Sequence, residues 1–479
     1  MNEALVRASD TTLSRVVLGP RSKYLGLTTL LAWHYCLWFV PSAFPNTFLL
    51  DDRITFSWLI ALAAAGVVPL VLAFQLGPRR HLGATPALVW SAAGLGALGT
   101  GVLASVGMMV ASPWIAYLSA FVIGSCAGVL WVLWGERLAC HRARFTLQRV
   151  APMYGGFLLG VVATTYLLPG WSAVAFVCLL PLLSGLLLHV HVRALPDARY
   201  PSLLPAKVAT EGRSTMVVVT VISFAAAFVC YYTVAIVPWE ALGVVQDSFT
   251  VGILLGGALI LFFALGQRLS PKRRSAYRVY PWLLMFSVVA CVLYLTDERL
   301  HVVSFLLALA ISSLFEILIT TYMGVLTLRG YAPPATAFAL SSGAIRLGIC
   351  LGNGTALLYE RVPGLHQTLT RPTFVLLVVL MSGLVISMVR QEYAIEELIR
   401  TPQAESALAT IVSCVAEEFR LSEREREILG LIGQGYTAAA VAEKLVISPY
   451  TVNTHIQHIY GKLGIHKRSE LISYLHRRD

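Results

Sequence analysis

The stretch SPYTVNTHIQHIYGKLGIHKRSEL, residues 448–471, is polar and basic, whereas most of the chain is strongly apolar. It opens with Ser448 and Pro449, which suit the cap and the first position of a helix. Apolar side chains then recur at the spacing of one helical face, at Val452, Ile456, Ile459 and Leu463. The stretch therefore predicts a short helix with one buried face and one polar face.

Residues 421–476 as a whole predict four short helices. Ser422 and Glu425 form a capping box, in which a hydroxyl and a carboxylate each satisfy a free backbone N–H group. Thr437 is expected to cap the second helix, and the tight turn VIS at 446–448 leads into the third. Two short helices joined by a tight turn, with a basic second helix, predict a helix-turn-helix.

The sequence LSEREREILGLIGQGYTAAAVAEKLVISPYTVNTHIQHIYGKLGIHKRSEL, residues 421–471, closely resembles the LuxR-type DNA-binding domain. The matching positions are Leu421, Glu425, Leu429, Gly435, Val441, Ala442, Leu445, Ser448, Thr451, Val452, His455, Ile459, Lys462, Leu463, Arg468 and Leu471. The resemblance implies a domain that binds double-stranded DNA as a homodimer. Such domains pair through the last helix, which here carries Leu471 and Leu475. A helical bundle or protein-interaction tail without a DNA role is the alternative.

The charges of this segment favour a nucleic-acid partner. Residues 444–478 contain six basic side chains and a single acid, Glu470, so binding to phosphates should weaken as salt is added. Side chains expected at or near the phosphates are Lys444, Tyr450, Thr451 and Lys462. The resemblance places base contacts at Asn453, Thr454 and Gln457. The amides of Asn and Gln suit the N6 and N7 atoms of adenine, so we expect half-sites that contain adenine.

The rest of the chain is typical of a membrane protein. It is 57% hydrophobic and 13% charged, whereas soluble domains carry about 25% charged residues. Windows long enough to cross the bilayer recur along it. The twelve predicted spans are 24–43, 54–76, 86–108, 114–135, 150–168, 171–191, 216–238, 249–267, 280–296, 301–327, 333–358 and 372–390. The division of 150–191 depends on the turn LPGW at 168–171.

The distribution of basic residues predicts the orientation of these spans. With both termini inside, the inner segments carry 20 Lys and Arg residues and the outer loops carry 4. Inner loops of membrane proteins are enriched in Lys and Arg. We therefore expect a multi-pass protein of the bacterial inner membrane, with the residues from 391 onward in the cytoplasm.

The spans divide six and six around a polar stretch, 193–215. Basic residues follow the second span, in FQLGPRR (74–80), and the eighth, in GQRLSPKRR (266–274). This arrangement resembles the major facilitator superfamily over roughly residues 20–390. That family has an Asp in each of these loops, and this chain has Gln75 and Gln267 instead. The departure weakens the expectation of active transport.

The predicted fold is therefore all-α, with a bundle of twelve membrane helices in two six-helix halves and a four-helix DNA-binding domain. The expected segments are a cytoplasmic N-terminal segment (1–23), a first membrane half (24–192), a cytoplasmic central loop (193–215), a second membrane half (216–390), a helical linker (391–419) and the DNA-binding domain (420–479). Apolar residues recur at helical spacing in the linker, which predicts an amphipathic helix. This helix would pack on the next domain or pair with a second copy. A solvated connector is the alternative.

Several polar and aromatic side chains in the spans are candidates for binding a ligand. Glu316 and Arg346 are predicted at similar depth, where charged groups pair or line a wet cavity. The aromatic and imidazole candidates are His34, Tyr35, Trp38, Trp131, Trp134, Tyr231 and Tyr232. Helix packing or an interfacial belt is the ordinary role of such residues. Together they favour a site for a small organic molecule that carries a charged group.

Signals for catalysis are missing from the sequence. The eight cysteines are scattered without a CxxC pair, and we find no phosphate-binding glycine loop, metal-ligand spacing or nucleophile constellation. We expect no enzyme, no cofactor and no metal. The sequence favours a membrane-embedded transcription regulator whose transporter-like bundle senses a small molecule. An active transporter with a regulatory tail is the alternative.

Overall fold

A computed structural model describes most of the chain in two compact units, Met1–Glu392 and Tyr393–Asp479, which we treat separately. The described residues are 24–44, 52–75, 82, 85–110, 112–140, 147–194, 210–242, 245–269, 279–433 and 436–477. The predicted segment 1–23, most of the central loop, the basic residues that follow the second span and all but Arg268 of those that follow the eighth lie outside them.

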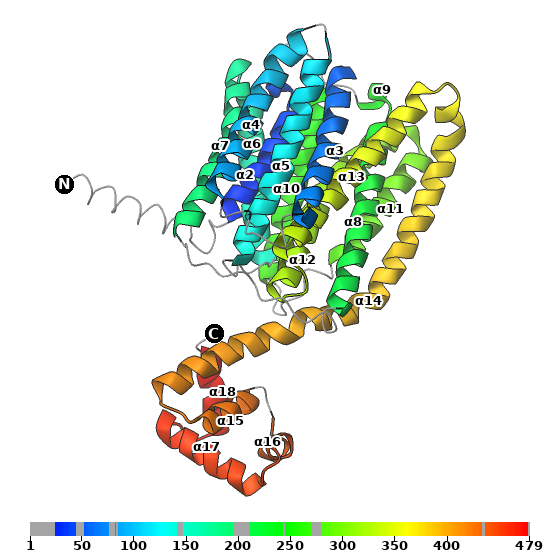
Figure 1. Ribbon diagram of the computed structural model, residues 1–479. Coiled ribbons are helices and arrows are strands. Elements are labelled where there is room, and N and C mark those ends of the chain that lie inside the picture. Colours follow the sequence, from blue (N-terminus) through cyan, green and yellow to red (C-terminus); the bar gives the residue numbers. More distant parts are fainter. Residues whose placement is uncertain are drawn as a thin grey trace, which may run out of the picture. The chain divides into compact units, whose positions relative to one another are not determined.

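The first unit is a bundle of long helices, and the described residues contain no strand (Figure 1). The helices of its first half are α2 (Leu25–Phe39), α3 (Asp52–Gln75), α4 (Pro86–Val102) with a π-helical extension (Leu103–Gly107), α5 (Trp114–Cys140), α6 (Leu147–Leu167) and α7 (Trp171–Ala194). The helices of its second half are α8 (Thr210–Ile236), the short α9 (Trp239–Leu242), α10 (Val245–Leu269), α11 (Tyr280–Thr296), α12 (His301–Leu328), α13 (Pro334–Arg361) and α14 (Leu365–Glu418).

Ten of the predicted spans are confirmed as helices that are long and apolar enough to cross a membrane, counted over the described residues. The other two predicted spans coincide with apolar helices of 15 and 17 residues, α2 and α11, which are shorter than the roughly 20 residues that a bilayer core requires. The division of 150–191 is correct, because α6 ends at Leu167 and Gly170 turns the chain with a φ of 48° before α7.

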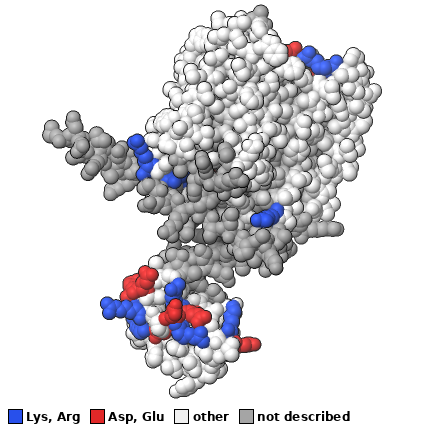
Figure 2. Space-filling view, in the orientation of Figure 1, with Lys and Arg blue, Asp and Glu red and all other residues white. Residues whose placement is uncertain are grey.

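Helices of the two halves pack along one another. Within the halves α3 packs on α5, α4 on α7 and α8 on α13, and between the halves α3 packs on α13 and α6 on α10. Gly124 of α5 permits one close approach, since a Cβ atom there would lie 2.0 Å from the carbonyl oxygen of Ala61 on α3. The visible surface of the first unit carries few charges among the described residues (Figure 2). Its exposed side chains include Leu98 and Phe262, as expected of helices that face lipid.

The last membrane helix is longer than expected. The sequence predicts a span that ends at 390 and a helical linker at 391–419, within which Pro402 lies. The structure has one helix, α14, that runs from Leu365 to Glu418. A helix can contain Pro402 when the loss of one backbone hydrogen bond is tolerated. The boundary between the two units falls inside α14.

Four short helices follow α14 in the second unit. They are α15 (Glu423–Gly433), α16 (Ala438–Leu445), α17 (Pro449–Leu463) and α18 (Arg468–Arg477). The predicted capping box is confirmed: Ser422 N donates to Glu425 Oε2 at 2.7 Å, and Glu425 N donates to Ser422 Oγ at 3.2 Å. Thr437 and Ser448 cap α16 and α17 through their hydroxyl groups, as predicted. Gly435, one of the positions that match the LuxR-type pattern, lies outside the described residues.

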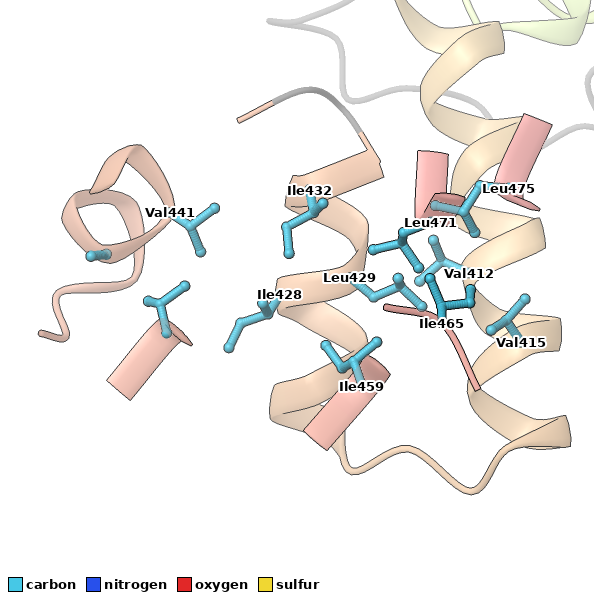
Figure 3. Close-up of a cluster of buried hydrophobic side chains, with 12 residues drawn as sticks. Val412, Val415, Ile428, Leu429, Ile432, Val441, Ile459, Ile465, Leu471 and Leu475 are labelled. Carbon is cyan, nitrogen blue, oxygen red and sulfur yellow. The ribbon is translucent and has the colours of Figure 1, made fainter. Parts of the chain in front are cut away.

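One apolar core holds these helices together with the end of α14 (Figure 3). Its buried members are Val412, Val415, Ile428, Leu429, Ile432, Val441, Ala442, Val452, Ile459, Ile465, Leu471 and Leu475. Val412 and Val415 belong to α14, so the predicted amphipathic linker packs on its own domain. The core is complete within Tyr393–Asp479, which favours independent folding of this unit.

Candidate functional site

The helix-turn-helix is formed by α16 and α17. Val446 ends α16 in the left-handed conformation, with a φ of 52°. Ile447 N donates to Ala442 O at 3.0 Å, which closes the turn. Ser448 Oγ accepts from Thr451 N at 3.0 Å, and Pro449 occupies the first helical turn. These local contacts fix the start of α17, which is the helix expected to read DNA.

One face of α17 is free of packing. Asn453, Thr454 and Gln457, the predicted base contacts, are all exposed. Thr454 Oγ1 donates to Tyr450 O at 3.1 Å, which leaves its methyl group outward. The amides of Asn453 and Gln457 have no hydrogen-bond partner among the described residues. Tyr450 is 82% exposed, so its ring and hydroxyl are also available. This face can accept and donate hydrogen bonds to base edges.

The predicted phosphate contacts fall into different environments. Lys444 Nζ donates to the hydroxyl of Tyr436 at 3.0 Å and lies 4.2 Å from the centre of its ring. Thr451 Oγ1 is 2.8 Å from Ser448 Oγ at the exposed start of α17. Lys444 and Thr451 therefore keep polar groups at the surface beside the exposed face of α17.

Lys462 has an internal partner instead. Its Nζ lies 2.6 Å from Glu425 Oε2 and 3.3 Å from Arg420 O. Burial alone would raise the pKa of the Glu425 carboxyl, but hydrogen bonds from Lys462 and Ser422 outweigh burial and hold that pKa below its usual value. The ammonium group of Lys462 thus ties α17 to the start of α15, and its expected role as a phosphate contact stays a prediction.

Two charged residues of the membrane unit form a buried ion pair. Nη2 of Arg346 on α13 lies 2.5 Å from Oε1 of Glu316 on α12, and the side chains are 7% and 3% exposed. Both helices belong to the second half. A buried charge without a partner is costly in a membrane, so the pair satisfies both groups.

Two residues of the first half contact this pair. Tyr35 on α2 donates its hydroxyl to Glu316 Oε2 at 3.3 Å. The ring of Trp131 on α5 faces the guanidinium of Arg346 at 5.7 Å, and its Nε1 donates to Ser341 Oγ on α13 at 3.2 Å. We name Tyr35, Trp131, Glu316 and Arg346 the central junction. It joins the two halves through polar contacts.

Aromatic rings continue from the central junction. His34 contacts Tyr35 with ring centres 5.7 Å apart, and it contacts Trp58 at 5.1 Å. Trp58 also contacts Trp38 at 5.5 Å and Tyr231 at 6.4 Å. The candidates His34, Tyr35, Trp38 and Tyr231 are thus brought together. The sequence reasoning missed Trp58, which lies in the predicted span 54–76.

Two other candidates lie elsewhere. Trp134 donates its Nε1 to Ser184 Oγ on α7 at 2.9 Å, inside the first half. Tyr232 packs against Phe374 on α14, with ring centres 5.3 Å apart, inside the second half. Tyr232 differs in direction from Tyr231, because neighbouring positions on a helix are about 100° apart. Their contacts are those of helix packing.

Comparison with known proteins clarifies the nature of the C-terminal unit. The family described as "Bacterial regulatory proteins, luxR family" matches residues 420–475. These residues form a LuxR-type DNA-binding domain. The oxygen regulatory protein NreC of Staphylococcus aureus, in strains JH9 and JH1, is 50% identical over 54 residues. The match covers 11% of this chain and 25% of each relative. The chain thus spans about a quarter of the length of these curated relatives.

Solved structures with a similar fold extend over the membrane unit. The human organic anion transporter MFSD10 has 16% sequence identity and a TM-score of 0.50, and the match covers 78% of this chain and 99% of that chain. A bacterial homologue of the iron transporter ferroportin has 12% identity and a TM-score of 0.51, covering 76% and 98%. At such low identity the likeness concerns the fold alone, which the membrane unit shares with these transporters. The protein thus joins a transporter-like membrane unit to a LuxR-type domain.

The two leucines expected at the dimer interface of the LuxR-type domain lie in its core. Leu471 is fully buried and Leu475 is 2% exposed, and both lie with Val412 and Val415 (Figure 3). Their expected role in a dimer interface stays a prediction. Their apolar character reflects contacts with α14, which lies before the matched residues 420–475.

Proposed function

We propose that the protein is a membrane-embedded transcription regulator. Its membrane unit would sense a small molecule, and its LuxR-type domain would bind promoter DNA. The observation that carries the proposal is the presence of both parts in one chain, with α14 belonging to both units. The curated relatives reported above match this chain over 54 residues, a quarter of their own length, so the combined activity is our inference.

In this proposal the exposed face of α17 enters the major groove. Asn453 and Gln457 would hydrogen-bond to adenine, and the methyl group of Thr454 would contact a neighbouring base. Lys444, Tyr450 and Thr451 would hold the phosphates on either side. Their exposure supports this role, whereas Lys462 would act by keeping α17 in position through Glu425.

The homodimer is also part of the proposal. LuxR-type domains pair through the last helix, which is α18 here. Leu471 and Leu475 would set the position of α18 from inside the core, and the opposite face of α18 would meet the second copy. Two half-sites about one turn of DNA apart would follow from such a pair.

Sensing would take place at the central junction, where both halves contact one buried ion pair. A ligand can shift an equilibrium only if it binds two conformations with different affinity. Tyr35 and Trp131 of the first half contact Glu316 and Arg346 of the second half. A ligand that took the place of either contact would bind best to a conformation in which the two halves are separated at the central junction. The resulting movement would reach the DNA-binding domain through α14.

The proposed location is the bacterial inner membrane, with both termini in the cytoplasm. The support is the excess of Lys and Arg in the segments assigned to the inner side, 20 against 4. This orientation would leave the LuxR-type domain on the side of the chromosome.

Electrophoretic mobility shift measurements test DNA binding directly. The fragment Tyr393–Asp479, which contains the complete core, should bind the DNA upstream of its own gene. Binding should weaken as salt is added, and Asn453→Ala should reduce it. A fragment that shows no salt-dependent binding, or one that is insensitive to Asn453→Ala, contradicts the proposed DNA contacts.

An active transporter with a regulatory tail remains the second candidate, because the membrane unit has a transporter fold. Uptake of a labelled inducer into sealed vesicles, with and without an ion gradient, separates the two functions. A regulator without transport should show binding that saturates and does not respond to the gradient. Accumulation driven by the gradient would favour the transporter.

A further inference from the structure

Tyr436 lies shortly before α16, and both of its backbone groups are held by neighbouring helices. Its N–H donates to the carbonyl oxygen of Leu431 on α15 at 3.1 Å. Its carbonyl oxygen accepts from Nη2 of Arg468 on α18 at 2.9 Å. The residue is nevertheless 37% exposed. The domain thus holds one exposed aromatic side chain in a defined position at the start of the helix-turn-helix.

The side chain of Tyr436 meets the ammonium group of Lys444. Nζ of Lys444 is 3.0 Å from the hydroxyl oxygen and 4.2 Å from the centre of the ring. A cation within about 6 Å of an aromatic ring is attracted to it. An ammonium group has only N–H donors, so the hydroxyl oxygen accepts this hydrogen bond. The O–H proton of Tyr436 is then available for another acceptor, and none is found among the described residues.

The contact with Tyr436 leaves the charge of Lys444 unneutralised. Lys462 differs in this respect, since its Nζ lies 2.6 Å from the carboxylate of Glu425. The partner of Lys444 is a neutral hydroxyl group, and the ammonium group has two further N–H donors. A surface cation with such donors attracts the phosphates of DNA.

The place of the two residues in the helix-turn-helix also fits contact with the DNA backbone. In complexes of such domains the first helix crosses the backbone, while the second lies in the major groove. The first helix is α16 here, which Thr437 caps and Lys444 approaches the end of. Tyrosine hydroxyls are among the groups that hold phosphate oxygens. A phosphate that reaches Lys444 also comes within reach of the Tyr436 hydroxyl, which is only 3.0 Å away.

We propose that Tyr436 and Lys444 form a clamp on one phosphate of the DNA backbone, to which the tyrosine hydroxyl and the ammonium group both donate. The inference rests on the proposed DNA binding and adds Tyr436 to its contacts. The hydroxyl accepts from a cation and donates to an anion, so both of its hydrogen bonds are charge-assisted. Because Tyr436 already orients Lys444 in the absence of DNA, less side-chain freedom is lost on binding.

Tyr436→Phe is the central variant, because it keeps the aromatic ring beside Lys444 and removes only the hydroxyl. Fluorescence anisotropy measures the affinity of the full-length protein in detergent micelles for the duplex upstream of its own gene and for an unrelated duplex. Tyr436→Phe should weaken both complexes about tenfold, as expected for the loss of a hydrogen bond to a charged group. The ratio of the two affinities should stay the same, since phosphate contacts carry no sequence information.

The dependence on salt separates the hydroxyl from the lysine. Tyr436→Phe removes no charge, so the slope of the logarithm of affinity against the logarithm of salt should match the wild type, whereas Lys444→Gln should reduce it by about 0.9. Tyr460→Phe is the matched control. Tyr460 packs against the core of the domain, so this variant should bind like the wild type. A changed slope or a changed ratio of affinities in Tyr436→Phe would give the tyrosine a structural role and overturn the proposal.

Duplexes with a single methylphosphonate, in which one phosphate at a time is uncharged, test whether the two side chains share a phosphate. At the shared position, Tyr436→Phe and Lys444→Gln should each lose most of their effect. Different positions for the two variants contradict the clamp.

The failure of this inference can be told from the failure of the proposed function. If the wild type binds DNA and Tyr436→Phe binds equally well, the clamp is excluded and the proposed DNA binding stands. A wild-type protein that binds neither duplex contradicts both the clamp and the proposed function.

Discussion

The ammonium group of Lys462 on α17 lies 2.6 Å from the carboxylate of Glu425 on α15. Glu425 is 5% exposed on its side chain, and its second role is to accept the backbone N–H of Ser422 in the capping box. One buried carboxylate thus fixes the start of the LuxR-type domain and the orientation of its recognition helix. Under the proposed function, Lys462 affects DNA binding by holding α17 in position through Glu425.

Glu425→Gln should destabilise the LuxR-type domain by about 1–2 kcal/mol, because it removes a charged hydrogen bond while Lys462 remains partly hydrated. The free energy of unfolding of Tyr393–Asp479, measured by urea titration at pH 7, tests this. Glu427→Gln is the matched control. Glu427 pairs with Arg424 at the surface, so its loss should cost about 0.5 kcal/mol or less. Equal effects of the two variants would contradict the role of Glu425.

The stability of the domain should also depend on pH through Glu425. Its pKa is lower in the folded domain than in the unfolded chain, where a Glu carboxyl titrates near about 4.3. The ionised carboxylate therefore stabilises the fold above that value, and the stabilisation is lost as the pH falls from about 5 toward the lowered pKa. Urea titrations across this range should show a smaller decline for Glu425→Gln than for the wild type. An identical decline would show that Glu425 does not carry the effect.

Lys444 and Lys462 should differ in their effect on DNA binding. Lys444→Gln should reduce the slope of the logarithm of affinity against the logarithm of salt by about 0.9, since one phosphate contact is lost. It should weaken specific and nonspecific DNA equally. Lys462→Gln should change the free energy of unfolding and leave this slope nearly unchanged. A larger loss of slope for Lys462 than for Lys444 would restore Lys462 as a phosphate contact.

Asn453→Ala and Gln457→Ala should each weaken binding to the specific site by about 1–3 kcal/mol, which is the usual worth of one bidentate base contact. Binding to unrelated DNA should change little, because these amides do not meet phosphates in the proposed complex. Fluorescence anisotropy with specific and unrelated duplexes measures both affinities. Cys414→Ser, an exposed change on α14, serves as the control and should alter neither.

Glycine packing in the membrane unit gives a prediction that is independent of DNA. Gly124→Ala places a Cβ atom 2.0 Å from the backbone carbonyl oxygen of Ala61, so α5 has to move away from α3. We expect destabilisation of about 3 kcal/mol and a clearly lower unfolding temperature in detergent. Gly94→Ala is the control, since a Cβ atom there meets nothing within 4 Å. Similar unfolding temperatures for both variants would contradict the close approach of α3 and α5.

The sequence predicts the helices of this protein better than their contacts. Apolar runs and caps are local signals, so ten of the twelve spans, the capping box at Ser422 and the turn at Gly170 are predicted correctly. The continuity of α14 through Pro402 was missed, because a proline ordinarily ends a helix and only the surrounding structure decides whether it does. The sequence predicts the apolar face of the linker but does not say what this face packs against. In the structure Val412 and Val415 of this face lie in the core of the LuxR-type domain.

Site residues were harder to predict because the pattern along one helix does not give the partner of each side chain. Trp131 and Trp134 are three positions apart on α5, yet Trp131 reaches Arg346 on α13 while Trp134 reaches Ser184 on α7. The sequence placed Glu316 and Arg346 at similar depth and left open whether they pair or line a wet cavity; in the structure they form an ion pair. Leu471 and Leu475 were assigned to a dimer interface from the resemblance alone, and their burial against α14 could not be foreseen from the family pattern.

The side of the membrane on which the LuxR-type domain lies is the most direct test of the account. Alkaline phosphatase and green fluorescent protein, fused in turn after Asp479, report the two sides, because the phosphatase is active outside the cytoplasm and the fluorescent protein folds inside it. We predict a fluorescent fusion and an inactive phosphatase. An active phosphatase and a dark fluorescent protein would place the domain away from the chromosome and contradict its role as a transcription regulator.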